Sequence, residues 1–217
     1  MKKHINSYLF LWIALLLMCL SCSKSKTPDY ASEMKSCLND TDRKLINDAV
    51  QLFEKKLAHK YQRQSIGKAY ISYIKELHTQ EVEPDFILSA ETKTIIDSLK
   101  NGGTYDKIWK KLETILKENN RYKDGVKTID IYTLDPNGIY LNCLIETSKN
   151  KIIKKHLMRK RETPEFSYAF AVEDFSSNFT EKDFDDNLNR MIIAINYYYE
   201  LYSLFEYLKI IKEVKAQ

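Results

Sequence analysis

The chain contains the residue types that most often do chemistry in proteins, but none of them stands in the spacing of a known site. Of its four histidines, His59, His78 and His156 lie in the main part of the chain, and they form no His-Glu-x-x-His or other metal-binding pattern. No serine lies in the Gly-x-Ser-x-Gly segment that is typical of hydrolases. Gly102-Gly103 is not followed by the Lys-Ser pair of a phosphate-binding loop. The sequence therefore predicts no catalytic residue, no metal and no cofactor.

Acidic residues are dense between positions 173 and 186, which raises the question of a calcium site. They do not follow the twelve-residue pattern of an EF-hand loop. Acidic side chains are also favoured in the first turn of a helix, because the helix dipole is positive there. Thr180 and Asp183 have the spacing of a capping box, so we assign most of these acids to the start of a helix. The cluster consists of Glu173, Asp174, Glu181, Asp183, Asp185 and Asp186.

Cys37 and Cys143 are the only cysteines that follow Cys22. Disulfides form in oxidising compartments such as the bacterial periplasm, so the two residues can form one if the fold brings them together. The alternative is that each is a small buried residue with a free thiol. The sequence leaves both alternatives open, because a separation in sequence does not fix a distance in space.

The first 22 residues combine a basic start, an apolar run and a cysteine. Two lysines follow Met1, apolar residues dominate from Tyr8 to Met18, and Ser21 directly precedes Cys22. This order is typical of a bacterial secretory signal peptide. It resembles the signal of bacterial lipoproteins, in which the cysteine after the cleavage site becomes the lipidated first residue. Ser21 fits the small residue that precedes the cleavage site, whereas Cys19 stands where lipoproteins usually have an aliphatic residue.

The resemblance implies that residues 1–21 are removed, that Cys22 is acylated, and that residues 22–39 link it to the folded part. The protein would then be tethered in the cell envelope. We expect the outer membrane facing the periplasm, because Cys22 is not followed by the acidic run that surface-exported lipoproteins often carry. One alternative is an uncleaved anchor, although the apolar run is shorter than the roughly 20 residues that cross a bilayer. Another is a soluble secreted protein, although no small-x-small cleavage site is evident.

Short patterns suggest two further surface sites. A cluster of basic residues near a membrane could contact anionic lipid headgroups, and the alternative is a solvated protein surface. Asp97-Ser98-Leu99 matches the short acceptor pattern for bacterial O-glycans, which makes Ser98 a candidate glycosylation site. The basic cluster consists of Lys154, Lys155, Arg159, Lys160 and Arg161.

The charge balance argues against nucleic-acid binding. The 217-residue chain carries a formal net charge of +4. Removal of residues 1–21 takes away Lys2 and Lys3 and no acidic residue, which leaves a net charge of +2. Nucleic-acid-binding domains carry a concentrated basic surplus, which a nearly neutral chain does not provide.

Hydrophobic periodicity predicts helices in the first half of the folded part and strands in the second. Apolar side chains recur at helical spacing in residues 40–59, 64–77, 90–99 and 104–119. Beyond residue 126 the pattern alternates, and Asp135-Pro136-Asn137-Gly138 predicts a turn between strands. The predicted strands are 127–133, 139–146, 151–158 and 166–172, which would form an antiparallel meander of three or four strands. The expected fold is one α+β domain over 40–217, with a helical part at 40–120, a sheet part at 126–173 and a long helix at 180–213.

The last predicted helix is apolar on most sides from Tyr197 to Ile211. Such a helix is either buried all round or paired with a partner. One interpretation is that it packs between the sheet and the N-terminal helices. The other is a protein-docking surface at Tyr198, Tyr202 and Phe205.

These observations predict a membrane-tethered envelope lipoprotein that binds another envelope protein and catalyses no reaction. The alternatives are a periplasmic immunity-type protein against a toxin, a lipid or glycan carrier, and an envelope hydrolase without a recognisable motif. A hydrolase requires a deep pocket that joins histidine or acidic side chains. A carrier requires a sizeable apolar or tyrosine-lined cavity.

Overall fold

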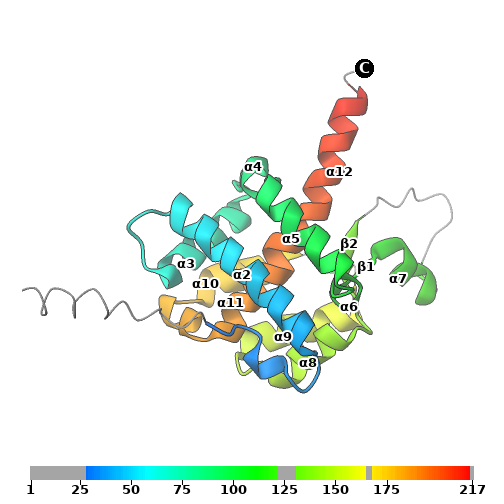
Figure 1. Cartoon of the computed structure of the whole chain (residues 1–217), viewed down its shortest axis with the longest axis horizontal. Helices are drawn as coiled ribbons and strands as arrows, with labels where there is room; N and C mark the ends of the chain where they lie inside the picture. Colours follow the sequence, from blue (N-terminus) through cyan, green and yellow to red (C-terminus); the bar gives the residue numbers. More distant parts are fainter. Residues whose placement is uncertain (1–27, 122–130, 165–167, 216–217) are drawn as a thin grey trace, which may run out of the picture.

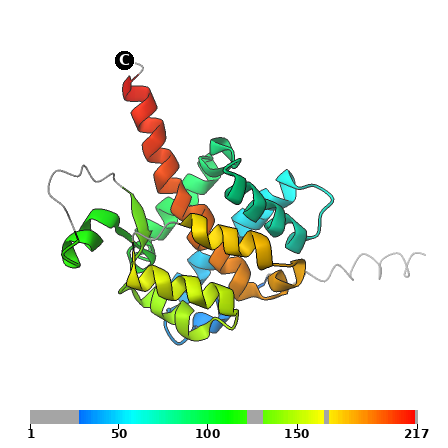
Figure 2. The same cartoon turned by 180° about the vertical axis from the view of Figure 1, so that it is seen from behind.

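The computed structural model describes residues 28–121, 131–164 and 168–215. They form a body of packed helices around one hydrophobic core, with a two-stranded sheet at its edge (Figures 1 and 2). The predicted α+β fold with a meander is therefore wrong. The described part of the predicted sheet region contains one three-residue strand and three helices. Residues 126–130 and 165–167 of that region lie outside the described residues.

The C-terminal part of the chain supplies the helix at the centre of the body. α11 (Asn187–Ile193), the π-helical turn η3 (Ala194–Tyr199) and α12 (Glu200–Lys215) follow one another without a break. All six residues of η3 are buried, and α2 packs against this turn. Further along, α12 leaves the body and projects away from it (Figures 1 and 2). The long predicted helix thus begins inside the core and ends outside it.

The capping box predicted at Thr180 is confirmed, but it starts a short 3₁₀ turn and not the long helix. The turn is η2 (Glu181–Asp185), and the Thr180 N–H donates to Asp183 Oδ2 at 2.8 Å. Asp186 then caps α11 by accepting a hydrogen bond from the Leu188 N–H at 2.8 Å. Two members of the acidic cluster therefore act as helix caps.

Three of the predicted N-terminal helices are confirmed. α2 (Asp40–Lys60), α3 (Ile66–Thr79) and α5 (Ala90–Asn101) lie within two residues of the predicted boundaries. Each follows a polar cap, because Asn39, Ser65 and Ser89 each accept a hydrogen bond from the backbone N–H three residues later. The short helix α4 (Pro84–Ile87) lies between α3 and α5 and begins with proline, whose fixed φ suits the first helical position.

The helix predicted at 104–119 is broken in its middle. α6 (Tyr105–Ile108) is followed by the strand β1 (Trp109–Lys111) and then by α7 (Leu112–Glu118). β1 pairs antiparallel with β2 (Tyr132–Leu134), and Trp109 lies opposite Leu134. Both of these side chains are buried, so the break places the indole in the core. Helical spacing does not reveal the break, because the partner strand lies far along the chain.

Three helices replace the predicted strands: α8 (Ile139–Thr147), α9 (Lys151–Glu162) and α10 (Tyr168–Asn178). The predicted turn at 135–138 is confirmed, since the Gly138 N–H donates to the Asp135 carbonyl oxygen at 3.0 Å. However, this turn leads into α8. A strand would place Ile139 and Leu141 on one buried face, yet Ile139 is 50% exposed while Leu141 and Leu144 are buried. Short apolar runs fit both periods, and only the surrounding contacts decide between them.

α9 and α10 show the same ambiguity. Asn150 caps α9 by accepting hydrogen bonds from the backbone N–H groups of Ile152 and Ile153. α9 then buries Ile153, His156 and Leu157, which have the i, i+3, i+4 spacing of a helix. In α10 the alternating pattern predicts Phe170 and Val172 on one face, but Phe170 is exposed and Val172 is buried.

The body begins earlier in the chain than predicted. Residues 28–39 belong to the segment 22–39 that we expect to be a linker. However, Tyr30, Ala31, Met34 and Leu38 are buried, and Ser32–Met34 form the 3₁₀ turn η1. The described part of the expected linker therefore packs onto the body and contributes these four side chains to the core. The sequence signal missed here is the spacing of Tyr30, Met34 and Leu38.

Asp42 makes a buried ion pair near the start of α2. Its side chain is 2% exposed; Oδ1 accepts from the Thr104 hydroxyl at 2.8 Å, and Oδ2 lies 2.7 Å from Lys107 Nζ. We expect Asp42→Asn to lower the free energy of unfolding by about 1–3 kcal/mol, because it removes a charged acceptor from a buried network. Urea denaturation measures this value. Asp40→Asn in the same helical turn is the control, since that carboxylate is exposed and should contribute less than about 1 kcal/mol. Equal losses in the two variants would contradict the prediction.

Candidate functional site

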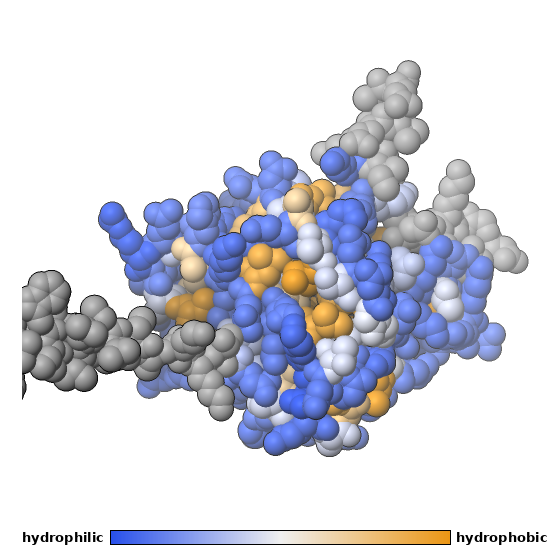
Figure 3. All heavy atoms as spheres, viewed as in Figure 1, coloured by the Kyte–Doolittle hydropathy of each residue, from blue (hydrophilic) through white to orange (hydrophobic). Residues whose placement is uncertain are grey.

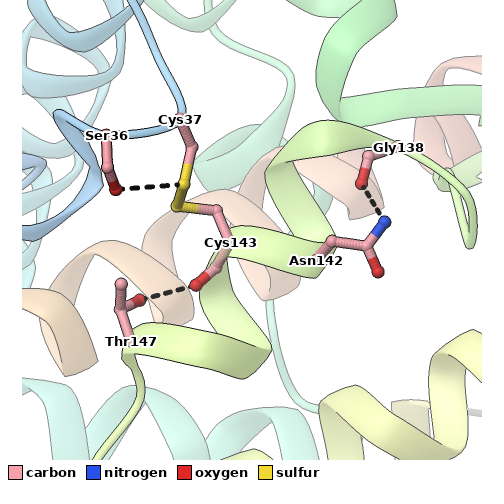
Figure 4. The surroundings of a disulfide bond; sticks show 6 residues. All are labelled: Ser36, Cys37, Gly138, Asn142, Cys143 and Thr147. Atoms are coloured by element: carbon pink, nitrogen blue, oxygen red, sulfur yellow. Dashed lines mark hydrogen bonds between the residues drawn. A yellow bond between two sulfur atoms is a disulfide. The ribbon is translucent and has the colours of Figure 1, made fainter.

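Cys37 and Cys143 are joined by a disulfide that connects the segment after η1 to α8 (Figure 4). Their Cα atoms are 6.1 Å apart although 106 positions separate them in sequence. Beside the bridge the Thr147 hydroxyl donates to the Cys143 carbonyl oxygen at 2.8 Å, within α8. Of the two alternatives that the sequence leaves open, the structure has the disulfide. Cys22 lies outside the described residues.

Two of the three residues predicted to face a partner are buried. Tyr198 is 0% exposed and Tyr202 is 7% exposed, so neither is available at the surface. Phe205 is partly buried against the core. The docking surface predicted at these three positions is therefore wrong for Tyr198 and Tyr202. The alternative, burial of the helix, holds for the part up to Tyr202, although helices rather than a sheet surround it.

The π-helical turn explains this burial. Tyr199 OH donates to the Ala49 carbonyl oxygen of α2 at 2.8 Å, and Tyr198 OH donates to the Phe86 carbonyl oxygen of α4 at 3.1 Å. In return, the Tyr197 carbonyl oxygen accepts from Tyr73 OH of α3 at 2.9 Å. Tyrosine is buried favourably only when its hydroxyl has a partner. Here consecutive tyrosines find partners on different helices, so this segment connects the body internally and offers no surface.

The exposed apolar residues of this helix lie further along. Leu204 and Phe205 are half-buried at the point where α12 leaves the body, and Leu208 is 41% exposed. The three residues have the i, i+1, i+4 spacing of one helical face. An apolar helical face that leaves the core is a candidate docking site for another protein. Leu204, Phe205 and Leu208 are called the α12 face below.

The basic cluster of the sequence does not form one surface. Lys160 points inward, where its Nζ lies 3.4 Å from Glu200 Oε1 and its side chain is 15% exposed. Lys155 pairs with Asp174 on α10 at 3.0 Å. Lys154 is half-buried, while Arg159 and Arg161 are exposed. The five residues therefore do not form one continuous surface for lipid headgroups. They lie on α9, and a helix distributes its side chains around its axis.

Ser98 lies on α5 and is half-buried. Its hydroxyl donates to the Thr94 carbonyl oxygen at 2.8 Å, one turn earlier in the same helix. Its glycosylation stays a prediction, and the acceptor hydroxyl is held within a regular helix.

One buried polar cluster has the chemistry that an active site requires. His156 Nε2 lies 2.8 Å from Asp174 Oδ2, and a histidine oriented by a carboxylate is the usual general base of hydrolases. A cavity beside His156 is also lined by Lys160, Asn196 and Glu200. This cavity measures about 30 Å³, which holds one or two water molecules. A substrate does not fit there, so this cavity is neither the deep pocket of a hydrolase nor the large cavity of a carrier.

The residues that the structure describes contain no group of three or more His, Cys, Asp and Glu side chains placed to hold a metal ion. Within the same residues, no helix is both long and apolar enough to cross a membrane.

The buried histidine makes stability depend on pH. Burial lowers the pKa of His156 below its ordinary value, and the hydrogen bond to Asp174 opposes this shift. The unfolded chain takes up a proton at this residue near pH 6.5 and the folded chain only at lower pH, so unfolding binds a proton between the two values. We therefore expect Tm to fall as the pH drops from about 7.5 to about 5.5. Thermal scans of His156→Gln should show a smaller fall, and His59→Gln, at an exposed position, should keep the full dependence. Identical slopes in all three proteins would contradict the assignment.

The protein thus has a helical body closed by a disulfide, a polar cluster around His156 whose cavity is too small for a substrate, and an apolar helical face that leaves the core. Comparison of the chain with models of protein families, with curated proteins and with solved structures finds no match.

Proposed function

We propose that the protein is a membrane-tethered envelope lipoprotein that acts by binding another protein and not by catalysis. The supporting observation in the structure is the α12 face, an apolar surface on a helix that extends beyond the body (Figures 1 and 2). The supporting observation in the sequence is the order of basic start, apolar run, Ser21 and Cys22. The tether gives the protein its location, and the projecting helix gives it a contact surface.

The start of the described chain and the free end of α12 lie on different sides of the body. In both views the described chain starts on the side of the body away from the free end of α12 (Figures 1 and 2). Five residues lie between Cys22 and Pro28, so the extended chain between the two spans at most about 20 Å. A lipid on Cys22 would therefore hold the body close to the membrane while α12 points away from it. This geometry favours a partner in the periplasm over the bilayer.

The partner chemistry follows from the α12 face. A single helix that leaves a core with apolar side chains gains stability only when another apolar surface covers them. Leu208 lies four residues after Leu204 and three after Phe205, and anchors at these spacings are typical of helices that pack into an apolar groove or against another helix. We therefore infer that the partner contributes an apolar groove or helix. A second copy of this chain is the competing occupant.

Site-specific photo-crosslinking in cells tests the proposal. A photoreactive phenylalanine analogue at Leu208 should give one dominant cross-linked species at the mass of this chain plus a second protein. The same analogue at Arg161, an exposed position on α9, is the matched control and should not give that species. Adding Phe205→Ser to the Leu208 probe should remove the product, with circular dichroism to verify folding. A product at twice the mass of the chain, or equal products at both positions, would overturn the proposal.

The tether has a separate test. Cys22→Ala should abolish incorporation of a labelled fatty acid and release the protein from the membrane fraction. Ser21→Ala is the control, since alanine is also a small residue before the cleavage site and should preserve labelling. Label that persists in Cys22→Ala would refute lipidation without affecting the test of the α12 face.

A further inference from the structure

A second surface lies where α2 approaches α4 and the start of α5. There a groove of about 400 Å³ is lined by lysine, histidine, serine and phenylalanine side chains and by two carboxylates, Asp85 and Glu91. Figure 3 shows the face that carries α2 and α5, on which apolar side chains gather between the two helices and hydrophilic side chains surround them. The groove is called the cationic groove below. Its lining residues are Lys55, Lys56, His59, Lys60, Asp85, Phe86, Ser89 and Glu91.

Lys56 has unusual surroundings for a lysine. Its Nζ donates to Ser89 Oγ at 2.8 Å and to Thr92 Oγ1 at 3.2 Å. It also lies 5.2 Å from the centre of the Phe86 ring and 5.5 Å from that of the Tyr198 ring. The ammonium group is therefore half-buried among neutral hydroxyls and aromatic faces. Burial lowers its pKa, which indicates that the charge is incompletely compensated.

The neighbouring lysines differ from Lys56 because carboxylates hold them. Lys55 Nζ lies 3.2 Å from Glu91 Oε1, and Lys60 pairs with Glu76 of α3. Glu91 is also the carboxylate whose charge acts on Lys56, but its oxygen is engaged by Lys55. A lysine ammonium has three donors, and the two hydroxyls use two of them. One donor and most of one positive charge thus remain for a ligand in the groove.

The start of α5 adds to the positive potential. Ser89 is the cap of this twelve-residue helix, and it lies beside Lys56 Nζ. The first N–H groups of a helix have no partner within the helix, and the dipole is positive at that end. Lys56 and the start of α5 therefore converge on one groove, and Phe86 supplies an apolar wall.

We propose that the cationic groove binds a small organic oxyanion, a phosphate or sulfate monoester, with its charged group at Lys56 and its organic part against Phe86. Phosphate recognition at helix starts and by lysine is a common use of these groups. The volume exceeds what an inorganic anion fills and lies in the range of small-ligand sites. The phosphate group could belong to a lipid headgroup or to a soluble ester, and the groove recognises the same chemistry in both.

The proposal is tested by titrating the protein without its lipid with phenyl phosphate and with inorganic phosphate. Calorimetry or NMR measures the two affinities. Phenyl phosphate should bind more tightly than inorganic phosphate. Lys56→Met, which keeps the aliphatic stem, should weaken phenyl phosphate binding about tenfold or more, because it removes a charge-assisted hydrogen bond. Lys44→Met on the same helix is the matched control, since that lysine is exposed and pairs with Asp48. It should leave the affinity unchanged.

A second variant should act in the opposite direction. Glu91→Gln removes the negative charge that acts on the Lys56 ammonium group. It should therefore strengthen phenyl phosphate binding. Absence of measurable binding at millimolar phenyl phosphate, or equal affinities of wild type and Lys56→Met, would overturn the proposal. Vesicles of phosphatidylcholine with and without phosphatidic acid then distinguish the source. Phosphatidic acid-dependent binding that Lys56→Met removes indicates a lipid headgroup, and binding of the soluble ester alone indicates a soluble ligand.

Discussion

Replacing Cys37 and Cys143 with alanine is expected to lower the free energy of unfolding by about 3–5 kcal/mol. The bridge spans 106 positions of the sequence, and a cross-link that closes a long loop restricts the unfolded chain more than one that closes a short loop. For a protein of this size the corresponding fall in Tm is on the order of 10 °C. Thermal and urea denaturation under non-reducing conditions measure both quantities.

The single variants provide the control for this prediction. Cys37→Ala and Cys143→Ala each remove the same cross-link, so either one should cost nearly as much as the double variant. Cys143 is buried and Cys37 is half-buried. A small difference in the free energy of unfolding between the two single variants therefore reports on the packing of these side chains and not on the cross-link. A reducing agent should destabilise the wild-type protein and leave the double variant unchanged. A wild-type Tm that does not respond to the reducing agent would refute a contribution of the disulfide to stability.

Phe53→Ala is expected to have an effect of similar size, a loss of about 3–5 kcal/mol in the free energy of unfolding. Phe53 is fully buried on α2, and its ring centre lies 5.5 Å, 5.0 Å and 4.8 Å from those of Tyr70, Tyr73 and Tyr198. Truncation removes the contacts of α2 with both α3 and η3 and leaves a cavity among rigid rings. The rings cannot collapse into it, because hydrogen bonds hold the Tyr73 and Tyr198 hydroxyls.

Phe170→Ala is the matched control, because it makes the same chemical change at an exposed position of α10. It should cost less than about 1 kcal/mol. Urea denaturation of the two variants side by side distinguishes core packing from a general effect of losing a phenyl ring. Losses of equal size would show that Phe53 is not at the centre of the core.

Variants that destabilise the core are unsuitable for testing the two proposed binding surfaces. The cationic groove lies beside Tyr198, and the α12 face begins two residues after Tyr202 on the same helix. A variant that loosens the aromatic core would therefore disturb either site indirectly. Lys56→Met and the Leu208 probe avoid this problem, since both act on side chains at or near the surface.

The N-terminal helices were predictable because their signals are local. α2, α3 and α5 each combine an apolar stripe at helical spacing with a polar cap, and both features lie within the segment itself. The turn at 135–138 and the capping box at Thr180 were predictable for the same reason. In each case a few neighbouring residues determine the backbone conformation.

The candidate sites were predictable only in part. The sequence indicates an apolar C-terminal helix, but not which of its residues the body covers. Tyr198 and Leu208 are both apolar positions of this helix, and only their neighbours make the first a core residue and the second an exposed one. Lys56 carries no signal at all, since its surroundings consist of Ser89, Thr92 and Phe86, which lie more than a helix away along the chain.

The sequence by itself determined the local elements of the first half of the chain, their caps, and the N-terminal pattern on which the proposed tether rests. The tertiary structure alone decided that α8, α9 and α10 are helices, that Cys37 meets Cys143, and which end of the last helix is buried. The physical reason is that a short apolar run satisfies both the helical and the strand period. Its conformation is then set by contacts with distant segments, here α6 and η1 for α8 and α3 for α10, and those contacts exist only once the chain has folded.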